Sequence, residues 1–158
     1  MIVDDESLAL SRLKRLLNEN GIEDITAFDN PIEALKEITK TKFDAVFLDI
    51  SMPNITGLEL ADSIIQLEPK TFIIFQTAYS EFALEAYKSG GMGYLVKPIE
   101  SNDIKNILEK VRNFKSSLNE ESKKILGKRG DKLYLIDIND IYYIKADLDE
   151  VIVRIKDA

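Results

Sequence analysis

The stretch that decides the fold is DAVFLDISMPNITG, which runs from Asp44 to Gly57. Four consecutive apolar residues, Ala45 to Leu48, lead directly into Asp49. A continuous apolar run of this kind predicts a strand that is covered on both faces. Its last residue is a carboxylate, which is costly to bury without a partner. The rest of the chain must therefore explain why a buried strand ends on Asp49.

The chain around this stretch alternates between predicted strands and predicted helices. Five apolar runs predict strands, namely IV before Asp4, then ITAF, AVFL, FIIF and YLV. Apolar residues at helical spacing separate them, as in the helix from about Leu58 whose Leu60, Ile64 and Leu67 we expect to point inward. Such alternation is typical of a parallel sheet with helices on both faces. Ligands bind such sheets beyond the carboxyl ends of the strands, where Asp49 would emerge.

Two of the predicted helices have recognisable starting residues. Asn30 is followed by Pro31, which predicts an N-cap and a proline at the first helical position. Ser80 is the predicted N-cap of the segment SEFALEAYKSGG, which ends on glycines. In that segment Phe82 and Tyr87 are candidates for either core or dimer contacts.

The composition excludes several kinds of chemistry. The 158 residues include neither cysteine nor histidine, so disulfides, thiolate or imidazole metal sites and Ser–His or Cys–His catalysis are impossible. The net charge of −7 argues against nonspecific nucleic-acid binding by the chain as a whole. With no apolar run of membrane-spanning length and no secretion signal, we expect a cytoplasmic protein without a membrane partner.

The composition changes near residue 120. Residues 1–121 hold 13 basic and 21 acidic side chains, a net charge of −8, whereas residues 122–158 hold 8 basic and 7 acidic, a net charge of +1. The later part contains the runs KLYLI, IYYI and EVIVRI, which predict antiparallel strands. Three short strands make a poor independent core. We therefore expect this part to begin a larger module, and the short first strand suggests trimming at the N-terminus as well.

The carboxylates at the strand ends are the main functional signal. Asp4 and Asp5 follow the first predicted strand, and Asp49 ends the third. Clustered carboxylates repel one another unless a cation neutralises them, and oxygen ligands suit Mg²⁺ or Mn²⁺. Thr77 and Lys97 end the fourth and fifth strands. Three acids, a lysine and a hydroxyl at one sheet edge predict a phosphoryl site with an aspartate nucleophile.

These residues carry a resemblance to a known family. The motifs VDDE, LDISMPNITG, TAY and YLVKP resemble those of two-component response regulator receivers over about residues 1–118. The resemblance implies a flavodoxin-like fold, a doubly wound five-stranded parallel sheet. It also implies that Asp49 is the phosphoacceptor and that a sensor histidine kinase is the donor. Asp5, Asp49 and the main-chain carbonyl of Ser51 would ligate Mg²⁺, with Asp4 acting mainly through water.

The resemblance assigns roles to the remaining motif residues as well. Lys97 would pair with the phosphoryl group, and Thr77 would move toward it. Tyr94 would then turn inward into the vacated space, although ordinary strand packing is the alternative. Ala78 is small and would leave access to the acyl phosphate.

Three further residues of the motifs shape loops. Pro98 follows Lys97, and the family usually has a cis peptide bond there, so we predict one. Pro53 and Gly57 would shape the loop after Asp49. We expect Gly57 to adopt a backbone conformation that is closed to other residues.

The last part resembles the first strands of a LytTR-type DNA-binding domain. The cadence of Ile138 to Val151 carries this resemblance, and residues 119–158 would be a linker and an incomplete output domain. The implied protein is a transcription regulator whose base-reading part lies beyond these residues. A homodimer through the fourth helix, fifth strand and fifth helix is a family-level expectation. A short dimerisation or packing appendage is the alternative for the tail.

Two other functions compete with the receiver interpretation. A phosphatase of the haloacid-dehalogenase type also uses an aspartate nucleophile and Mg²⁺, but it has Asp-x-Asp after its first strand, whereas Asp4 and Asp5 are adjacent here. A receiver fold that no longer takes phosphate is the second alternative. A P-loop nucleotide hydrolase is excluded because the chain lacks that glycine-rich loop. We therefore expect a phosphoacceptor with only slow self-dephosphorylation, and not an enzyme.

Overall fold

The computed structural model describes residues 1–79, 81, 83–121, 124–129, 132–147 and 150–155. The chain divides into two compact units, Met1–Asn113 and Phe114–Ala158. Among the described residues, no helix has both the length and the apolar character that crossing a membrane requires.

The first unit alternates between strands and helices as the sequence predicts. Its strands are β1 (Ile2–Val3), β2 (Ala27–Phe28), β3 (Ala45–Asp49), β4 (Phe72–Thr77) and β5 (Gly93–Val96). Its helices are α1 (Ser7–Glu19), α2 (Pro31–Ile38), α3 (Gly57–Leu67), α4 (Ala83–Lys88) and α5 (Ser101–Glu121), the last of which continues beyond this unit.

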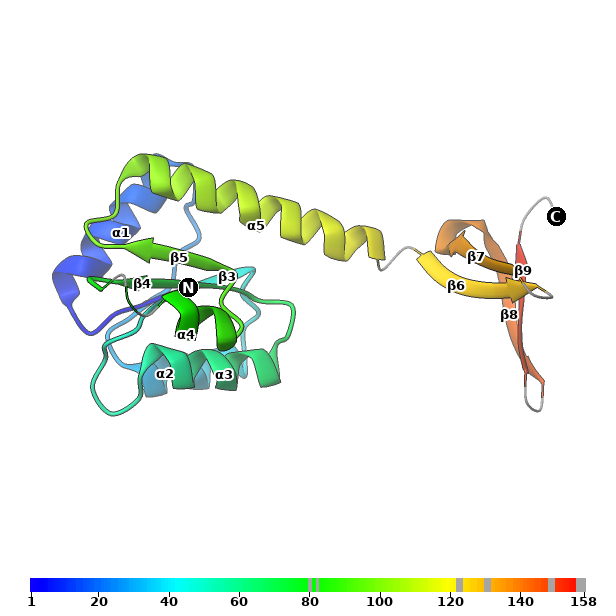
Figure 1. Cartoon of the computed structure of the whole chain (residues 1–158), viewed down its shortest axis with the longest axis horizontal. Coiled ribbons are helices and arrows are strands. Elements are labelled where there is room, and N and C mark those ends of the chain that lie inside the picture. The colour runs from blue at the N-terminus through cyan, green and yellow to red at the C-terminus, as the bar shows by residue number, and fades with distance from the viewer. Residues whose placement is uncertain (80, 82, 122–123, 130–131, 148–149, 156–158) are drawn as a thin grey trace. The chain divides into compact units, whose positions relative to one another are not determined.

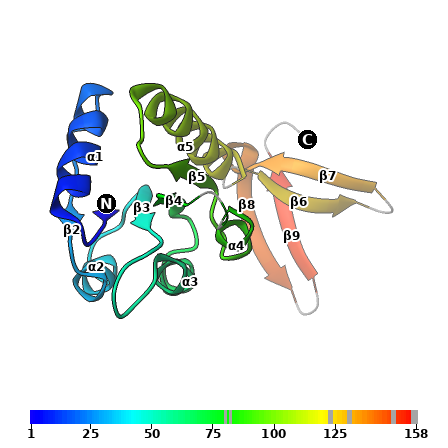
Figure 2. The same ribbon diagram turned by 60° about the vertical axis from the view of Figure 1, so that its left-hand side comes forward.

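The five strands form one parallel sheet in the order β2-β1-β3-β4-β5. The order reverses at β1, which is the arrangement of a doubly wound sheet. Helices α1 and α5 lie on one face, and α2, α3 and α4 lie on the other (Figures 1 and 2). The predicted flavodoxin-like fold is therefore confirmed, and the carboxyl ends of the strands meet at one edge.

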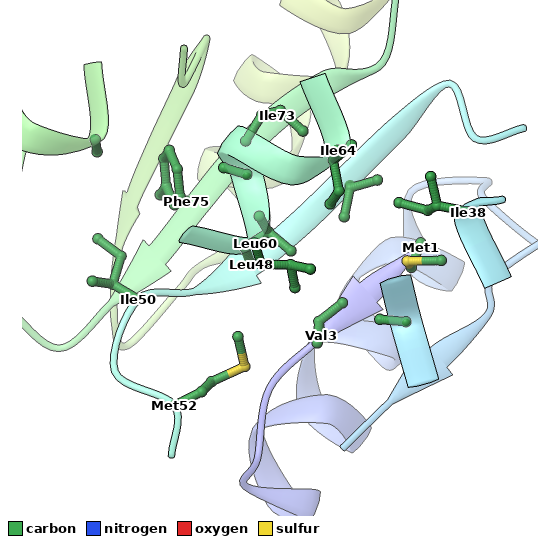
Figure 3. Close-up of a cluster of buried hydrophobic side chains, with 14 residues drawn as sticks. Met1, Val3, Ile38, Leu48, Ile50, Met52, Leu60, Ile64, Ile73 and Phe75 are labelled. Carbon is green, nitrogen blue, oxygen red and sulfur yellow. The ribbon is translucent and has the colours of Figure 1, made fainter. Parts of the chain in front are cut away.

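The core explains why the strands are continuous apolar runs. Side chains of β1, β3 and β4, among them Val3, Leu48 and Phe75, pack against Leu60 and Ile64 of α3 (Figure 3). All five are fully buried. Truncating any one of them to alanine removes about 2–5 kcal/mol of stability. This packing fixes the strands, and hence the residues at their ends, relative to one another.

The predicted helix boundaries are partly confirmed. The Asn30 side chain accepts a hydrogen bond from the Ile32 amide, and Pro31 opens α2. Leu67 was expected to point inward but is 49% exposed; it is the last residue of α3 and comes after the fully buried Ile64. The predicted cap Ser80 and the side chain of Phe82 lie outside the described residues. Tyr87 is exposed, so it is not a core residue.

The second unit contains antiparallel strands, as predicted. β7 (Lys132–Asp137) pairs with β6 (Lys124–Arg129), and β8 (Ile141–Asp147) pairs with β9 (Glu150–Ile155). A short 3₁₀ helix, η1 (Ile138–Asp140), connects the two hairpins. β6 was not predicted, because it contains Gly127 and is bounded by basic residues that weaken the strand pattern.

Candidate functional site

The site forms where four strands end. Asp4 follows β1, Asp49 and Thr77 are the last residues of β3 and β4, and Lys97 follows β5. β1 pairs directly with β3, with Val3 opposite Leu48, so the two carboxylates emerge side by side. The sequence therefore places these residue types at one edge because parallel strands all end in the same direction.

Lys97 joins the two carboxylates. Its Nζ lies 2.7 Å from Asp4 Oδ2 and 2.8 Å from Asp49 Oδ1. Asp4 is completely buried, and Asp49 is 5% exposed. Burial lowers the pKa of Lys97, but its hydrogen bonds to the two aspartates outweigh this and raise that pKa. The buried strand can thus end on Asp49 because an ammonium group is available to neutralise it.

Both carboxylate oxygens of Asp4 accept hydrogen bonds. Its Oδ1 accepts from the Glu6 amide over 3.0 Å, and its Oδ2 accepts from Gln76 Nε2 over 3.2 Å as well as from Lys97. Burial nevertheless raises the pKa of Asp4, because desolvation outweighs these hydrogen bonds. A negative charge at Asp4 is therefore only partly compensated by the protein.

Asp49 is oriented by its own loop. Its Oδ2 accepts from the Ser51 amide over 2.8 Å, while Oδ1 faces Lys97. The Gly57 amide donates to the Ile50 carbonyl over 3.0 Å, which closes the loop between β3 and α3. These contacts hold the carboxylate and the loop that contains Pro53 in one arrangement.

Gly57 is required here for a reason that differs from the prediction. Its φ is not positive, so the expected special backbone conformation is wrong; Asn54 is the residue of this loop with a positive φ, 69°. A Cβ on Gly57 would instead lie 2.1 Å from the Asp49 carbonyl oxygen. Glycine is needed because the start of α3 passes too close to the β3 backbone for any side chain.

Thr77 and Tyr94 both bind the backbone of Tyr79. Thr77 is buried, and its Oγ1 accepts from the Tyr79 amide over 3.3 Å. The Tyr94 hydroxyl donates to the Tyr79 carbonyl, while its ring packs against the core cluster. Ala78, which lies between Thr77 and Tyr79 in the chain, is exposed. In this arrangement Tyr94 combines strand packing with a polar contact to the β4–α4 loop.

The remaining predicted residues take different positions. The Lys97–Pro98 peptide bond is cis, as predicted. Asp5 is exposed, in contrast to Asp4 and Asp49. Within the described ranges, no group of three or more acidic side chains is close enough together to form a metal cage. Mg²⁺ usually keeps several waters and needs only one or two carboxylates, so the donor set of Asp49, Asp5 and the Ser51 carbonyl fits that ion chemically.

Gln76 is the site residue that the sequence analysis missed. It is 1% exposed and contacts Asp4, and it lies in β4 directly after the apolar run Phe72–Phe75. A signal was available, because a glutamine follows the apolar run FIIF and directly precedes Thr77. Buried amides are normally hydrogen-bonded, so its position predicted a polar partner at the strand ends.

The raised pKa of Asp4 gives a prediction for pH dependence. Because the folded pKa lies above the ordinary value of 3.8, the free energy of unfolding falls as the pH rises through the window between the two values. Asn at this position cannot lose a proton. We expect Asp4→Asn, with a chelator present, to be more stable than the wild type by about 1 kcal/mol at pH 7.

Urea unfolding of the two proteins across this pH range measures the effect. The difference should shrink as the pH falls toward 3.8, the ordinary value for Asp4, where the wild-type side chain becomes protonated. A difference that is constant with pH, or a variant less stable than the wild type at pH 7, would contradict the account of Asp4 as a partly compensated charge.

Comparisons with known proteins agree with this geometry. The family model described as "Response regulator receiver domain" matches residues 1–109. A response regulatory protein of Shewanella oneidensis is 38% identical over 96% of this chain and 66% of its own length. The transcriptional regulatory protein YpdB of Escherichia coli is 32% identical over 92% of this chain and 64% of its own length. The chain thus spans just under two thirds of these curated relatives.

A solved structure supports the same relationship. The response regulator TrrA of Thermotoga maritima, in complex with Mg²⁺ and BeF, superimposes with a TM-score of 0.64 and 36% identity over 70% of this chain and 95% of that chain. The shared region is the doubly wound sheet whose strand ends carry Asp4, Asp49 and Lys97. The fold, these residues at its edge and the family match over most of the chain lead to one conclusion: the chain belongs to the response regulator receiver family.

Proposed function

We propose that this receiver accepts a phosphoryl group on Asp49 from the phosphohistidine of a sensor histidine kinase, with Mg²⁺ or Mn²⁺ as cofactor. The observation that carries the proposal is the position of Asp49. Its carboxylate is nearly buried at the strand edge, one oxygen faces Lys97 and the other accepts the Ser51 amide. This side chain is therefore held in place, and a cation lies beside it.

The chemistry follows from these contacts. An Asp49 oxygen attacks phosphorus and forms a P–O bond. The P–N bond to the histidine of the donor breaks, and the imidazole leaves and takes up a proton. The Lys97 ammonium already contacts both Asp49 and Asp4 and neutralises charge that builds up on the transferred group. Thr77, at the end of the adjacent strand, supplies a hydroxyl for the product.

The divalent ion would be held by Asp5, Asp49 and the Ser51 carbonyl, with Asp4 nearby. When bound, the ion supplies positive charge for the phosphoryl oxygens. Among the described residues, Lys97 is the cation that forms ion pairs with the two buried acids, and the exposed Asp5 directly follows Asp4 in the chain. This surplus of negative charge favours a divalent cation over a second protein cation.

Intact mass after incubation with acetyl phosphate and Mg²⁺ tests the proposal. We expect the wild type to gain one phosphoryl group, and Asp49→Asn to gain none, because the amide is a poor nucleophile. EDTA should abolish the gain in the wild type. The matched control is Asp62→Asn, an exposed aspartate of α3 outside the site, which should be modified like the wild type.

Two outcomes would contradict the proposal. No gain in mass by a folded protein would favour a receiver fold that works without phosphate. Steady turnover of a phosphate ester would favour the haloacid-dehalogenase-type phosphatase, because a receiver is a phosphoacceptor and not an enzyme with multiple turnovers.

The output that we propose is transcriptional. The relative YpdB is named a transcriptional regulatory protein, and it extends beyond the region that this chain matches. The second unit contributes the hairpins β6–β7 and β8–β9, of which β7, β8 and β9 correspond to the strands predicted for the start of a LytTR-type domain. We therefore propose that DNA is contacted by a complete output domain in a cytoplasmic regulator.

Dimerisation through α4, β5 and α5 is the proposed link to that output. Leu84, Tyr87 and Val96 are large apolar residues of α4 and β5, and each is at least 45% exposed. We expect a beryllofluoride–Mg²⁺ mixture to raise the apparent mass in solution, measured by light scattering, toward that of a dimer. Tyr87→Glu should reduce this increase, whereas Ile32→Glu, an exposed apolar position of α2, should not. An unchanged wild-type mass would contradict the proposed dimer.

A further inference from the structure

Gln76 has no part in the phosphoryl chemistry described above, yet it is one of the most buried polar side chains of the described residues. It is 1% exposed, and it lies on β4 directly before Thr77. A buried amide is costly unless it is hydrogen-bonded. Its Nε2 donates to Asp4 Oδ2 over 3.2 Å, so its contact is with an acid of the site.

We infer that Gln76 is a positioning residue that acts through Asp4 and thereby sets the affinity of the strand-end acids for a divalent ion. The inference rests on the proposed function, because it concerns the same site. Asp4 Oδ2 is shared between the Gln76 amide and the Lys97 ammonium, and Oδ1 accepts from Glu6. Three donors on its two oxygens restrict the orientation of the carboxylate.

The backbone of Gln76 supports the end of the strand that carries the second acid, Asp49. Gln76 is in register with Asp49 in the β3–β4 pairing, and its carbonyl accepts from the Ile50 amide over 3.2 Å. The residue therefore contacts the Asp4 side chain with its amide and supports the end of β3 with its main chain. One residue of β4 thus spans the ends of both strands that carry the buried acids.

This arrangement has a consequence for ion binding. An acid that lies beside an ion is effective only when its carboxylate stays in one orientation, and partners behind the ligands typically change metal affinity 10–100-fold. Without the Gln76 amide, Lys97 would be the one remaining donor to Asp4 Oδ2 among the described residues. Asp4 could then turn with Lys97, and the acids would no longer be held in a fixed relation.

Gln76→Met tests the inference, since methionine has a similar length and apolar stem but no amide. We expect its affinity for Mg²⁺ alone, measured by isothermal titration, to fall about tenfold. The matched control is Thr71→Val, which also removes a buried hydrogen bond beside β4, from Thr71 Oγ1 to the Phe43 carbonyl, at the other end of the strand. That variant should bind Mg²⁺ within about twofold of the wild type, because its lost contact is remote from the acids.

A second measurement, without metal, separates this inference from the proposed function. The Glu6 amide donates to Asp4 Oδ1, so its hydrogen exchange reports how firmly Asp4 is held. We expect exchange at Glu6 to be about fivefold faster in Gln76→Met, the effect of losing a hydrogen bond worth about 1 kcal/mol. Thr71→Val should leave exchange at Glu6 unchanged.

The two measurements give distinct outcomes. Weaker Mg²⁺ binding and faster Glu6 exchange in Gln76→Met alone support the inference. Mg²⁺ affinity within twofold of the wild type, or equal effects of both variants, overturns it. If the wild type itself binds no Mg²⁺, the inference about affinity fails together with the proposed metal site; a Glu6 effect confined to Gln76→Met would then show that Gln76 still orients Asp4.

Discussion

Replacing Lys97 with methionine is expected to lower the free energy of unfolding by about 3 kcal/mol at neutral pH. The Lys97 ammonium contacts Asp4 and Asp49 at 2.7 and 2.8 Å, and both carboxylates are buried. Without it, the two buried carboxylates would lose the cation with which they form ion pairs. The Lys97 side chain is itself 24% exposed, so the effect should lie at the lower end of the range for buried pairs.

Urea unfolding with a chelator present measures this loss. The matched control is Lys42→Met, which breaks an exposed pair with Glu68 at 3.9 Å and should cost less than about 1 kcal/mol. The double variant Asp4→Asn/Lys97→Met should recover much of the stability, because it removes the buried charge together with its partner.

The stability loss caused by Lys97→Met should also depend on pH in a defined direction. Burial already raises the pKa of Asp4, and loss of Lys97 would raise it further. Acid should therefore protonate Asp4 and narrow the difference between Lys97→Met and the wild type. A loss below about 1 kcal/mol, or one that grows in acid, would contradict the role of Lys97 as the neutralising cation.

Gly57→Ala is expected to destabilise the protein by about 2 kcal/mol. An alanine Cβ would lie 2.1 Å from the Asp49 carbonyl oxygen, which is backbone and cannot rotate away. Overpacking of this kind costs about 3 kcal/mol, whereas the better helix propensity of alanine returns at most about 1 kcal/mol, because Gly57 is the first residue of α3. The steric term should therefore outweigh the propensity gain.

Thermal or urea unfolding measures the change, with Gln66→Ala as the control. Gln66 is an exposed residue of α3, so alanine there changes helix propensity without a clash. Because the shifted backbone carries Asp49, phosphoryl uptake from acetyl phosphate should slow as well. A Gly57→Ala protein as stable as the wild type would show that the β3–α3 loop can move apart at little cost.

The fold was predictable because its signals are local. Apolar runs such as Ala45 to Leu48 predict buried strands, and Asn30 followed by Pro31 indicates the start of a helix. The exposure of Leu67 was not predictable from periodicity, because Leu67 has the same helical spacing as the buried Leu60 and Ile64 but is the last residue of α3. The sequence alone likewise could not show that Gly57 faces a carbonyl, since the close approach involves a residue eight positions earlier in the chain.

The site was predictable in its residue types but not in its contacts. Strand ends placed Asp4, Asp49 and Lys97 together, and the structure joins them through one ammonium group. The difference between Asp4, which is buried, and the adjacent Asp5, which is exposed, depends on how the chain turns after β1. Gln76 was missed because it lies between the apolar run FIIF and Thr77, and only the Thr77 hydroxyl was assigned to the site at this strand end.

The contacts of the Tyr79 backbone connect the buried site to the protein surface. Its amide is held by the buried Thr77 hydroxyl, and its carbonyl is held by the Tyr94 hydroxyl. The backbone of Tyr79 is thus hydrogen-bonded both to the buried Thr77 and to Tyr94 of β5. Tyr79 is itself 50% exposed, so any rearrangement of Thr77 alters a feature that a partner can touch without reaching Asp49.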